Sequence, residues 1–234
     1  MSDSPIAAMF DRISPKYDAL NHLLSFNIDK VWRRKTAKVV AKSNPKAILD
    51  LATGTADLAI ELAKRNPQAR IIGVDFSEKM LAIGKEKILQ RHFEDQIKLL
   101  QGDAANLPFP DNSFDAVTIA FGVRNFENLD KGLSEMFRVM KPEGQVVILE
   151  FSNPEKFPVK QVYRLYFKYI LPKIGEWVSK DKSAYSYLPA SVEKFPKPDD
   201  FLQILSNKGL KNGAKKSLSM GIATMYWGNK AGIL

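Results

Sequence analysis

The chain contains no cysteine and only two histidines, His22 and His92, in 234 residues. Disulfide bonds and cysteine-ligated zinc or iron–sulfur sites are therefore excluded, and a metal site built from several histidines is nearly excluded. No apolar run approaches the ~20 residues that a membrane-spanning helix needs. The N-terminus lacks a basic start followed by a long apolar run, so we expect no secretion signal. These absences predict a cytoplasmic protein and leave open a peripheral attachment to the inner face of the membrane.

The composition fits one globular domain, with 45% hydrophobic and 26% charged residues. The net charge of +9 is unevenly distributed along the chain. Residues 1–46 carry a net +5 and residues 153–234 a net +8, whereas residues 47–152 carry a net −4. Basic flanks of this kind suit anionic lipid headgroups or nucleic acid phosphates, and an ordinary solvated Lys-rich surface is the alternative.

The pattern of residues 47–150 alternates short apolar runs with segments of helical spacing, which predicts an α/β doubly wound sheet. Strands are predicted at 47–51, 70–75, 97–101, 114–120 and 145–150, and helices at about 56–66, 78–90 and 129–139. Ser77 is expected to cap the second of these helices. We expect a turn at 141–144, before the fifth strand. Outside the core, we expect helical structure over 5–43, a helix over 159–174, and a helix with one or two strands after Phe201.

A ligand-binding turn is predicted where the first strand meets the first helix, in Asp50-Leu51-Ala52-Thr53-Gly54-Thr55-Ala56-Asp57. In open α/β sheets, ligands bind at the carboxyl ends of the strands around such points. Gly54 lets the backbone approach a ligand closely. Asp75 follows 21 residues later and can accept hydrogen bonds from both hydroxyls of a ribose.

Two kinds of cofactor use this geometry. A dinucleotide requires three glycines so that a helix N-terminus can hold the pyrophosphate. Here two of those positions carry Ala or Thr, and Asp57 at the helix start would repel a pyrophosphate. The same carboxylate suits the cationic sulfonium or α-ammonium of S-adenosylmethionine. A methyltransferase is therefore favoured over a dinucleotide-dependent oxidoreductase. The loop Gly102-Asp103-Ala104 adds to this, because it resembles the adenine-binding loop of Class I methyltransferases.

Nearly the whole chain resembles the ubiquinone/menaquinone biosynthesis C-methyltransferases. The first signature of that family matches residues 17–32, with Tyr17, Asp18, Asn21, Ser25 and Trp32 at the expected places. Leu20 stands there where Met is usual, and Asp29 where His is usual. The second signature matches residues 138–144 and ends at Glu150-Phe151-Ser152, with Glu143 in place of a usual Gly. Phe121-Gly122-Val123-Arg124-Asn125 and residues 187–192 are also similar to the family.

The resemblance implies a Class I S-adenosylmethionine-dependent methyltransferase fold. This is a Rossmann-like doubly wound sheet with a helical N-terminal segment and substrate-covering insertions. We expect a single domain, in which residues 1–46 form a lid, residues 47–152 form the cofactor-binding core, and residues 153–234 form substrate-side helices and final strands. The expected cofactor contacts are Asp50, Thr53, Gly54, Thr55, Asp57, Asp75, Phe76, Asp103, Ala104 and Ala120; some members have Ser in place of Ala120.

The activity implied is a C-methylation late in respiratory quinone synthesis, with S-adenosyl-L-methionine as cofactor and a membrane-resident polyprenyl quinol as substrate. Because the chain begins close to the first signature, demethylmenaquinol is expected rather than a benzoquinol. No metal and no nucleic acid partner is expected, and a homodimer is left open. RNA methylation is disfavoured because Ala120-Phe121-Gly122-Val123 replaces the Asn/Asp-Pro-Pro-aromatic motif. Another small molecule, such as a sterol or a phenolic metabolite, is the alternative substrate.

Ring methylation needs an electron-rich carbon, which a quinol offers once one phenol is deprotonated. A nearby group must take that proton or stabilise the phenolate. Arg124 is the first candidate, for phenolate stabilisation or for positioning a water, because a guanidinium with a pKa above ~12 is a poor base. Pairing with a surface carboxylate is its structural alternative. Asp103, acting through water, and His22 are further catalytic candidates.

Contacts with the substrate are expected from Asn125 and Tyr187, and from Tyr17 and Asn21, which close over both ligands. Ordinary helix packing is the alternative for Tyr17 and Asn21. Aromatic and aliphatic residues of the helix predicted over 159–174 either line a prenyl channel or form ordinary core. They are Tyr163, Leu165, Tyr166, Phe167, Tyr169, Ile170 and Leu171.

Overall fold

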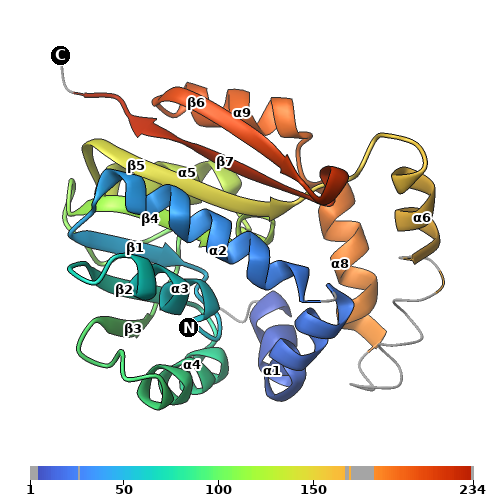
Figure 1. The fold of residues 1–234 in the computed structure, drawn as a ribbon, viewed down its shortest axis with the longest axis horizontal. Helices are drawn as coiled ribbons and strands as arrows, with labels where there is room; N and C mark the ends of the chain where they lie inside the picture. Colours follow the sequence, from blue (N-terminus) through green and yellow to red (C-terminus); the bar gives the residue numbers. More distant parts are fainter. Residues whose placement is uncertain (1–4, 26, 167–168, 170–181, 233–234) are drawn as a thin grey trace.

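The structure is a computed structural model that describes residues 5–25, 27–166, 169 and 182–232 (Figure 1). Within these residues seven strands form one sheet, in the order β3-β2-β1-β4-β5-β7-β6. The strands are β1 (Ala47–Leu51), β2 (Arg70–Asp75), β3 (Ile97–Gln101), β4 (Phe114–Ala120), β5 (Met140–Phe151), β6 (Leu210–Leu218) and β7 (Ala223–Lys230). The first five run parallel, and β7 is antiparallel to both neighbours. The chain winds outward from β1 to β3 and returns to β4, so the switch point lies between β1 and β4.

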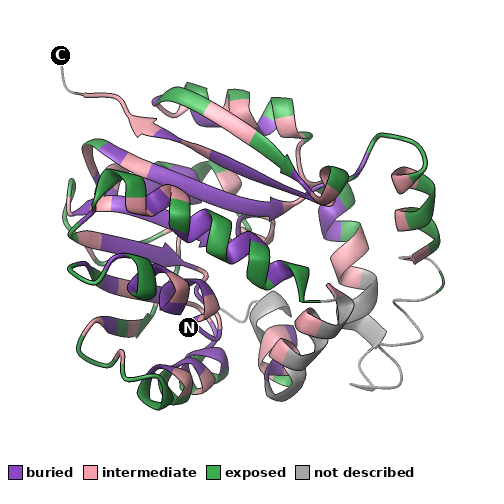
Figure 2. Ribbon diagram, viewed as in Figure 1, coloured by how far each residue is buried: buried purple, intermediate pink, exposed green. Residues whose placement is uncertain are grey.

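Helices cover both faces of this sheet (Figure 1). One face packs against α2 (Ile28–Val40), α3 (Asp57–Arg65) and α4 (Glu78–Gln90), and the other against α5 (Leu129–Val139) and α9 (Pro198–Asn207). Neighbouring strand residues enter different cores, Ile48 on the first face and Leu49 on the second. A strand buried on both sides is mainly apolar, which explains the apolar runs of the sequence. Figure 2 shows buried residues along the central strands and on the helix surfaces that face them.

Most of the predicted element boundaries are confirmed. β1 to β4, α4 and α5 span the predicted residues, and the Ser77 hydroxyl caps α4 by accepting a hydrogen bond from the amide of Met80 at 3.1 Å. The predicted N-terminal helical segment divides into α1 (Pro5–Leu24), α2 and the short η1 (Ala41–Ser43). Between α1 and α2, Asn27 adopts a left-handed φ of 60°, a conformation that does not continue a right-handed helix.

The prediction that a turn over 141–144 precedes the fifth strand is wrong. β5 already begins at Met140, so these residues lie within the strand. Phe114 pairs with Met140, and Ala116 pairs with Gln145, so two residues along β4 correspond to five along β5. The extra residues form a bulge inside the strand. Glu143 lies in this bulge with φ 61°, at the position where the family usually has glycine.

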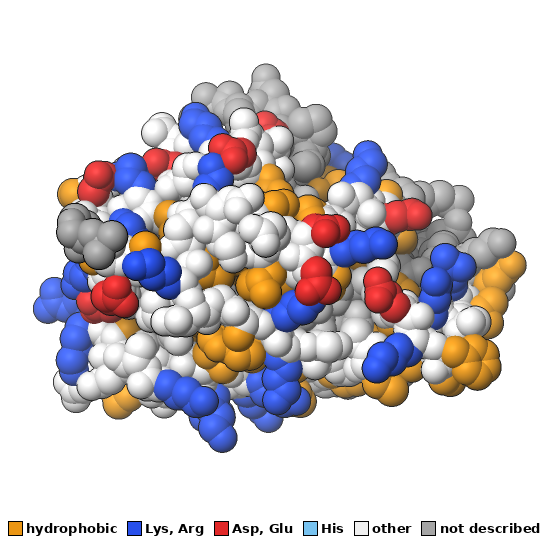
Figure 3. Space-filling model, turned by 90° about the horizontal axis from the view of Figure 1, so that it is seen from above, with side chains coloured by type: hydrophobic (Ala, Val, Ile, Leu, Met, Phe, Trp, Pro, Cys, Tyr) orange, Lys and Arg blue, Asp and Glu red, His pale blue; other side chains and the backbone are white. Residues whose placement is uncertain are grey.

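The C-terminal part adds α6 (Val159–Leu165), α8 (Lys182–Lys194), α9 and the β6–β7 hairpin. Residues 167–168 and 170–174 of the helix predicted over 159–174 lie outside the described residues. No helix in the described ranges is both long and apolar enough to cross a bilayer. The edge strand β6 exposes Lys211 and Lys216, which discourages strand-to-strand aggregation. Seen from above, basic side chains are spread among acidic ones, with hydrophobic groups at the right-hand end (Figure 3).

Candidate active site

A cavity of about 440 Å³ lies where four parallel strands end at their carboxyl sides. Each strand contributes wall residues from the loop that follows it, and α1 covers the cavity with Phe10 and Tyr17. The wall includes eight of the predicted site residues: Tyr17, Gly54, Asp75, Phe76, Asp103, Ala104, Ala120 and Asn125. Volumes of this size hold cofactors and drug-sized ligands.

Asp75 joins two of these loops. Its Oδ2 accepts a hydrogen bond from the Gly54 amide at 2.7 Å, and its Oδ1 accepts one from the Ser77 amide at 2.9 Å. Burial raises the pKa of Asp75, while these backbone hydrogen bonds act in the opposite direction. A carboxylate has about four lone-pair sites, so Asp75 can still accept from a hydroxyl donor in the cavity.

Gly54 leaves open space beside the backbone. It has φ 56°, and no heavy atom lies within 4 Å of the place where a Cβ would stand. A ligand can therefore approach the main chain of this loop directly. Together with Asp75 and Asp103 on the cavity wall, the site fits S-adenosylmethionine, which presents a ribose, an adenine amino group and a methionine moiety.

Asp50 and Thr53 stand behind the cavity wall. Asp50 accepts hydrogen bonds from the hydroxyls of Thr53 and Thr118, both at 2.7 Å, and is almost completely buried. Burial raises the pKa of Asp50 to about 6, although the two hydroxyls lower it. The pair therefore fixes the shape of the loop after β1, and their predicted contact with the cofactor stays a prediction.

Thr55 and Asp57 are engaged with α1 and α4. The Thr55 hydroxyl donates to Asp18 Oδ1 at 2.6 Å, and Lys87 Nζ donates to Asp18 Oδ2 at 2.8 Å. Lys87 also forms an ion pair with Asp57. Burial raises the pKa of Asp57, but Arg33 and Lys87 outweigh it and hold the pKa below its usual value. The carboxylate of Asp57 is therefore already paired with cations of this chain, and the predicted contacts of Thr55 and Asp57 with the cofactor stay predictions.

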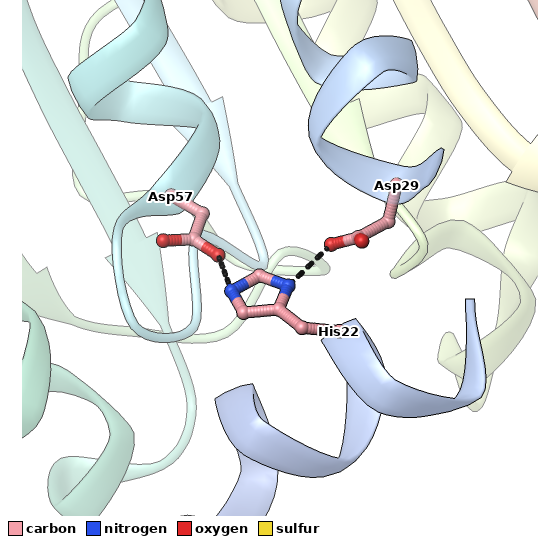
Figure 4. Close-up of side chains that lie close together, drawn as sticks. All are labelled: His22, Asp29 and Asp57. Atoms are coloured by element: carbon pink, nitrogen blue, oxygen red, sulfur yellow. Dashed lines mark hydrogen bonds and ion pairs between the residues drawn. The ribbon is translucent and has the colours of Figure 1, made fainter. Parts of the chain in front are cut away.

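His22 lies between two carboxylates that come from different helices (Figure 4). Its Nδ1 is 2.9 Å from Asp29 Oδ2 on α2, and its Nε2 is 3.7 Å from Asp57 Oδ2 on α3. Asp29 also pairs with Arg33, and Asp57 pairs with Lys87. Although these three side chains could offer metal ligands, the carboxylates are already neutralised by cations. The arrangement attaches α1 to the core at a point outside the cavity wall, and catalysis by His22 stays a prediction.

Arg124 lies on η2 (Val123–Asn125), directly after β4, and its side chain is 6% exposed. Its Nη1 donates to Glu150 Oε1 at 2.8 Å, and its own amide donates to Glu150 Oε2 at 3.1 Å. Its Nε donates to the Ser191 hydroxyl of α8 at 3.3 Å. The guanidinium carbon also stands 5.3 Å from the centroid of the Phe151 ring. Arg124 therefore pairs with a buried carboxylate at the end of β5. The alternative of a pair with a surface carboxylate is wrong.

Asn125 connects Arg124 to the cavity, because it is the next residue and belongs to the cavity wall. The Tyr187 hydroxyl of α8 donates to Asn125 Oδ1 at 2.9 Å. Burial raises the pKa of Tyr187, and the charge of Arg124 opposes this effect. The side chain of Asn21 falls outside the described set.

The residues considered for a prenyl channel lie on different sides of α6. Tyr163 and Tyr166 are half-buried, whereas Leu165 and Tyr169 are 57% and 53% exposed. Phe167, Ile170 and Leu171 lie outside the described residues. Burial raises the pKa of Tyr163, and Arg124 lowers it, which places this tyrosine within electrostatic reach of the guanidinium. Whether the half-buried side of this segment lines a prenyl channel or forms ordinary core stays a prediction.

The sheet order, the cavity at the switch point and the helical cover are those of the Class I S-adenosylmethionine-dependent methyltransferase fold. Solved structures share this fold. A SAM-dependent methyltransferase from Aquifex aeolicus is 19% identical with a TM-score of 0.58, covering 84% of this chain and 89% of that one. The [4+2]-cyclase SpnF is 16% identical with a TM-score of 0.71, covering 97% and 96%. A cyclase with this fold shows that the fold alone does not determine the reaction.

The chain belongs to the ubiE/COQ5 methyltransferase family, whose match covers residues 1–230. The demethylmenaquinone methyltransferase of Bacteroides fragilis is 44% identical over 225 residues, 96% of this chain and 92% of that protein. The ubiquinone/menaquinone biosynthesis C-methyltransferase UbiE of Geotalea daltonii is 46% identical over 226 residues, 96% of each chain. The predicted family, fold, enzyme class and methyl donor are thus confirmed.

Proposed function

We propose that this chain transfers a methyl group from S-adenosylmethionine to a ring carbon of demethylmenaquinol, forming menaquinol. The observation that carries the proposal is the buried guanidinium of Arg124, one residue from the cavity-lining Asn125. It places a guanidinium, held by its ion pair with Glu150, next to the cofactor cavity, where a cationic group can stabilise a phenolate. The choice of a naphthoquinol is supported by relatives named demethylmenaquinone methyltransferases, 44% identical in Bacteroides fragilis and 46% identical in Thermus thermophilus.

The cofactor would be held by the loops after β1, β2 and β3. Asp75 offers its remaining lone pairs to the ribose hydroxyls, and Asp103 offers its carboxylate to the adenine amino group. The open backbone at Gly54 leaves room for the methionine moiety. When bound, S-adenosylmethionine supplies a methyl group that is already activated by its sulfonium. Phe10 and Tyr17 of α1 line this space.

The chain's own contribution to the reaction is to make the quinol ring nucleophilic. The positive charge of Arg124 lowers the pKa of a nearby phenol, so that the phenol releases its proton to water and the phenolate pushes electron density onto the neighbouring ring carbon. That carbon bonds the methyl group as the bond from methyl to sulfur breaks. The ring carbon then loses its own proton and aromaticity is restored. An oxidised quinone ring is electron-poor and cannot follow this course.

Glu150 determines where the charge of Arg124 is placed. Because it accepts from the guanidinium and from the amides of Arg124 and Phe151, it fixes both the side chain and the backbone of η2. Tyr187 fixes Asn125 in the same way from α8. We assign Arg124 to phenolate stabilisation, and Asn125 and Tyr187 to orienting the ring. His22 and Asp57 we assign to holding α1 over the cavity.

The test is a transfer assay with methyl-labelled S-adenosylmethionine and the purified protein in detergent. Chemically reduced demethylmenaquinone, the oxidised quinone and a demethylated benzoquinol are compared. We expect label on the reduced naphthoquinol and none on the oxidised form. Transfer to the benzoquinol alone would overturn the choice of substrate. Absence of transfer to any quinol, in protein shown by calorimetry to bind the cofactor, would overturn the proposed function.

A further inference from the structure

An apolar surface stands out at one end of the molecule, on α6 and the loop before it. Phe157 is 81% exposed, Val162 63%, Leu165 57% and Tyr169 53%. Val162 and Leu165 are three residues apart in α6 and so share one side of this helix, and Tyr169 follows beyond its end. The other side carries Tyr163 and Tyr166, which are half-buried. Solvent exposure of so many large apolar groups in one segment marks an interaction site.

The charges of the same segment are mainly positive. Residues 155–166 contain Lys156, Lys160 and Arg164 against the single acidic residue Glu155. Apolar groups on one side of a helix and Lys or Arg on its polar side are typical of helices that lie in the interface of an anionic membrane. Figure 3 shows hydrophobic and basic side chains close together at the right-hand end, where Figure 1 has α6.

The position of α6 connects this apolar surface with the active site. Its inward residue Tyr163 is within electrostatic reach of Arg124, which is bonded to Ser191 of α8 and to Glu150 of β5. Figure 1 shows α6 at the same end of the molecule as α8. A substrate that resides in a bilayer could pass along α6 to Arg124 without crossing bulk water.

We propose that the α6 face, formed by Phe157, Val162, Leu165 and Tyr169 with the cations Lys156, Lys160 and Arg164, docks on an anionic phospholipid bilayer. The docking explains how a polyprenyl quinol reaches the active site, and in that respect alone it rests on the proposed function. The apolar side chains enter the interface between headgroups and acyl chains, while the three cations contact phosphate-bearing headgroups. Transfer of an exposed apolar side chain out of water supplies the affinity, and the cations supply the preference for anionic lipid.

Vesicle flotation tests the docking without any quinol. The intact chain is mixed with phosphatidylcholine vesicles that contain or lack phosphatidylglycerol, at low and high salt. We expect binding to the anionic vesicles that weakens with salt, and a loss of about tenfold or more in the variant Phe157→Ser with Val162→Ser. Lys156→Glu with Arg164→Glu should abolish the preference for anionic lipid. The matched control is Leu89→Ser on α4, since Leu89 is 62% exposed and Val162 is 63% exposed.

Equal binding by the wild type, the double serine variant and the Leu89→Ser control would overturn the proposal. It would also be overturned if sedimentation showed a dimer that the double serine variant dissociates, because a second copy of the chain would then occupy this face. The melting temperature of each variant is compared with that of the wild type. An unchanged melting temperature shows that a loss of binding is not a loss of fold.

A second measurement connects the docking to turnover. The double serine variant should methylate a short-chain, water-soluble quinol at the wild-type rate, while its rate on a long-chain quinol embedded in anionic vesicles falls about tenfold. An equal fall on both quinols would contradict a role in membrane access. If the wild type methylates neither quinol, the proposed function fails, and flotation still decides whether the α6 face binds lipid.

Discussion

The buried pair of Arg124 and Glu150 allows a structural role to be separated from a chemical one. Their side chains are 6% and 0% exposed. In the Arg124→Met variant, Glu150 keeps the backbone amides of residues 124 and 151 as donors but loses its cation. A buried charge left without its partner costs about 3–5 kcal/mol of unfolding free energy. For a chain of this length each kcal/mol lowers the melting temperature by roughly 2–4 °C, so a fall of about 10 °C is expected.

The second step removes the remaining charge with Glu150→Gln in the same chain. A neutral amide carries no buried charge, and its single carbonyl oxygen can still accept from one of the two backbone donors, which bond to different oxygens of Glu150. Part of the lost unfolding free energy should therefore return. Turnover should not return, because the transition state still lacks its cation. Loss of one such electrostatic contact lowers kcat by about 100-fold or more. The two variants should therefore differ in stability and agree in activity.

The assay combines urea unfolding, calorimetry of S-adenosylmethionine binding, and turnover with reduced demethylmenaquinone. Cofactor affinity should remain within about twofold of the wild type in the double variant, since neither residue belongs to the cavity wall. Recovery of kcat together with stability in the double variant would refute the reasoning. In that case Arg124 would act on the fold alone, and another group would have to stabilise the phenolate.

Three further predictions concern Asp75 in the cavity wall, Asp50 in β1 and Glu143 in the bulge of β5. Asp75→Ala should weaken S-adenosylmethionine binding by about tenfold or more, through loss of charge-assisted hydrogen bonds; unchanged affinity by calorimetry would contradict the ribose assignment. Burial raises the pKa of Asp50 from 3.8 to about 6, so its stabilising contribution is complete below about pH 4 and is lost as the pH rises through 6. Relative to Asp50→Asn, the wild type should therefore lose about 2–3 kcal/mol of unfolding free energy over that window. If urea titrations give the same difference in unfolding free energy between the two proteins at pH 4 and at pH 7, this prediction is wrong. Glu143→Gly should stabilise the chain by about 1 kcal/mol, because glycine adopts the φ of 61° without strain; an unchanged or lower melting temperature would count against strain at that position.

Much of the core could be predicted because its signals are local. The central strands β1 and β4 are mainly apolar runs, since burial on both faces of a parallel sheet leaves little place for alternation. Ser77 is a capping residue at the start of α4, and its hydrogen bond is local as well. The cofactor cavity could be predicted for the same reason. Gly54, Asp75 and Asp103 each follow a strand, and the sheet brings the ends of those strands together.

The remainder depends on contacts between residues distant in the sequence. The segment at 141–144 has the residues of a turn, but pairing with β4 retains it within β5 as a bulge. Glu150 resembles any acidic residue at the end of a strand until the fold places it 2.8 Å from Arg124. The histidine between Asp29 and Asp57 joins three helices, so no sequence spacing could indicate it. Pro189 lies inside α8, where a proline normally argues against a helix.

The most direct test of the proposed chemistry is the atom of the quinol that receives the methyl group. Reduced demethylmenaquinone is incubated with the protein and S-adenosylmethionine carrying a ¹³C-labelled methyl group, and the product is examined by NMR and mass spectrometry. The account predicts a labelled methyl carbon bonded to the ring, the loss of one ring proton, and two hydroxyl groups that can still be oxidised to the quinone. A labelled methyl ether that retains the ring proton would contradict it.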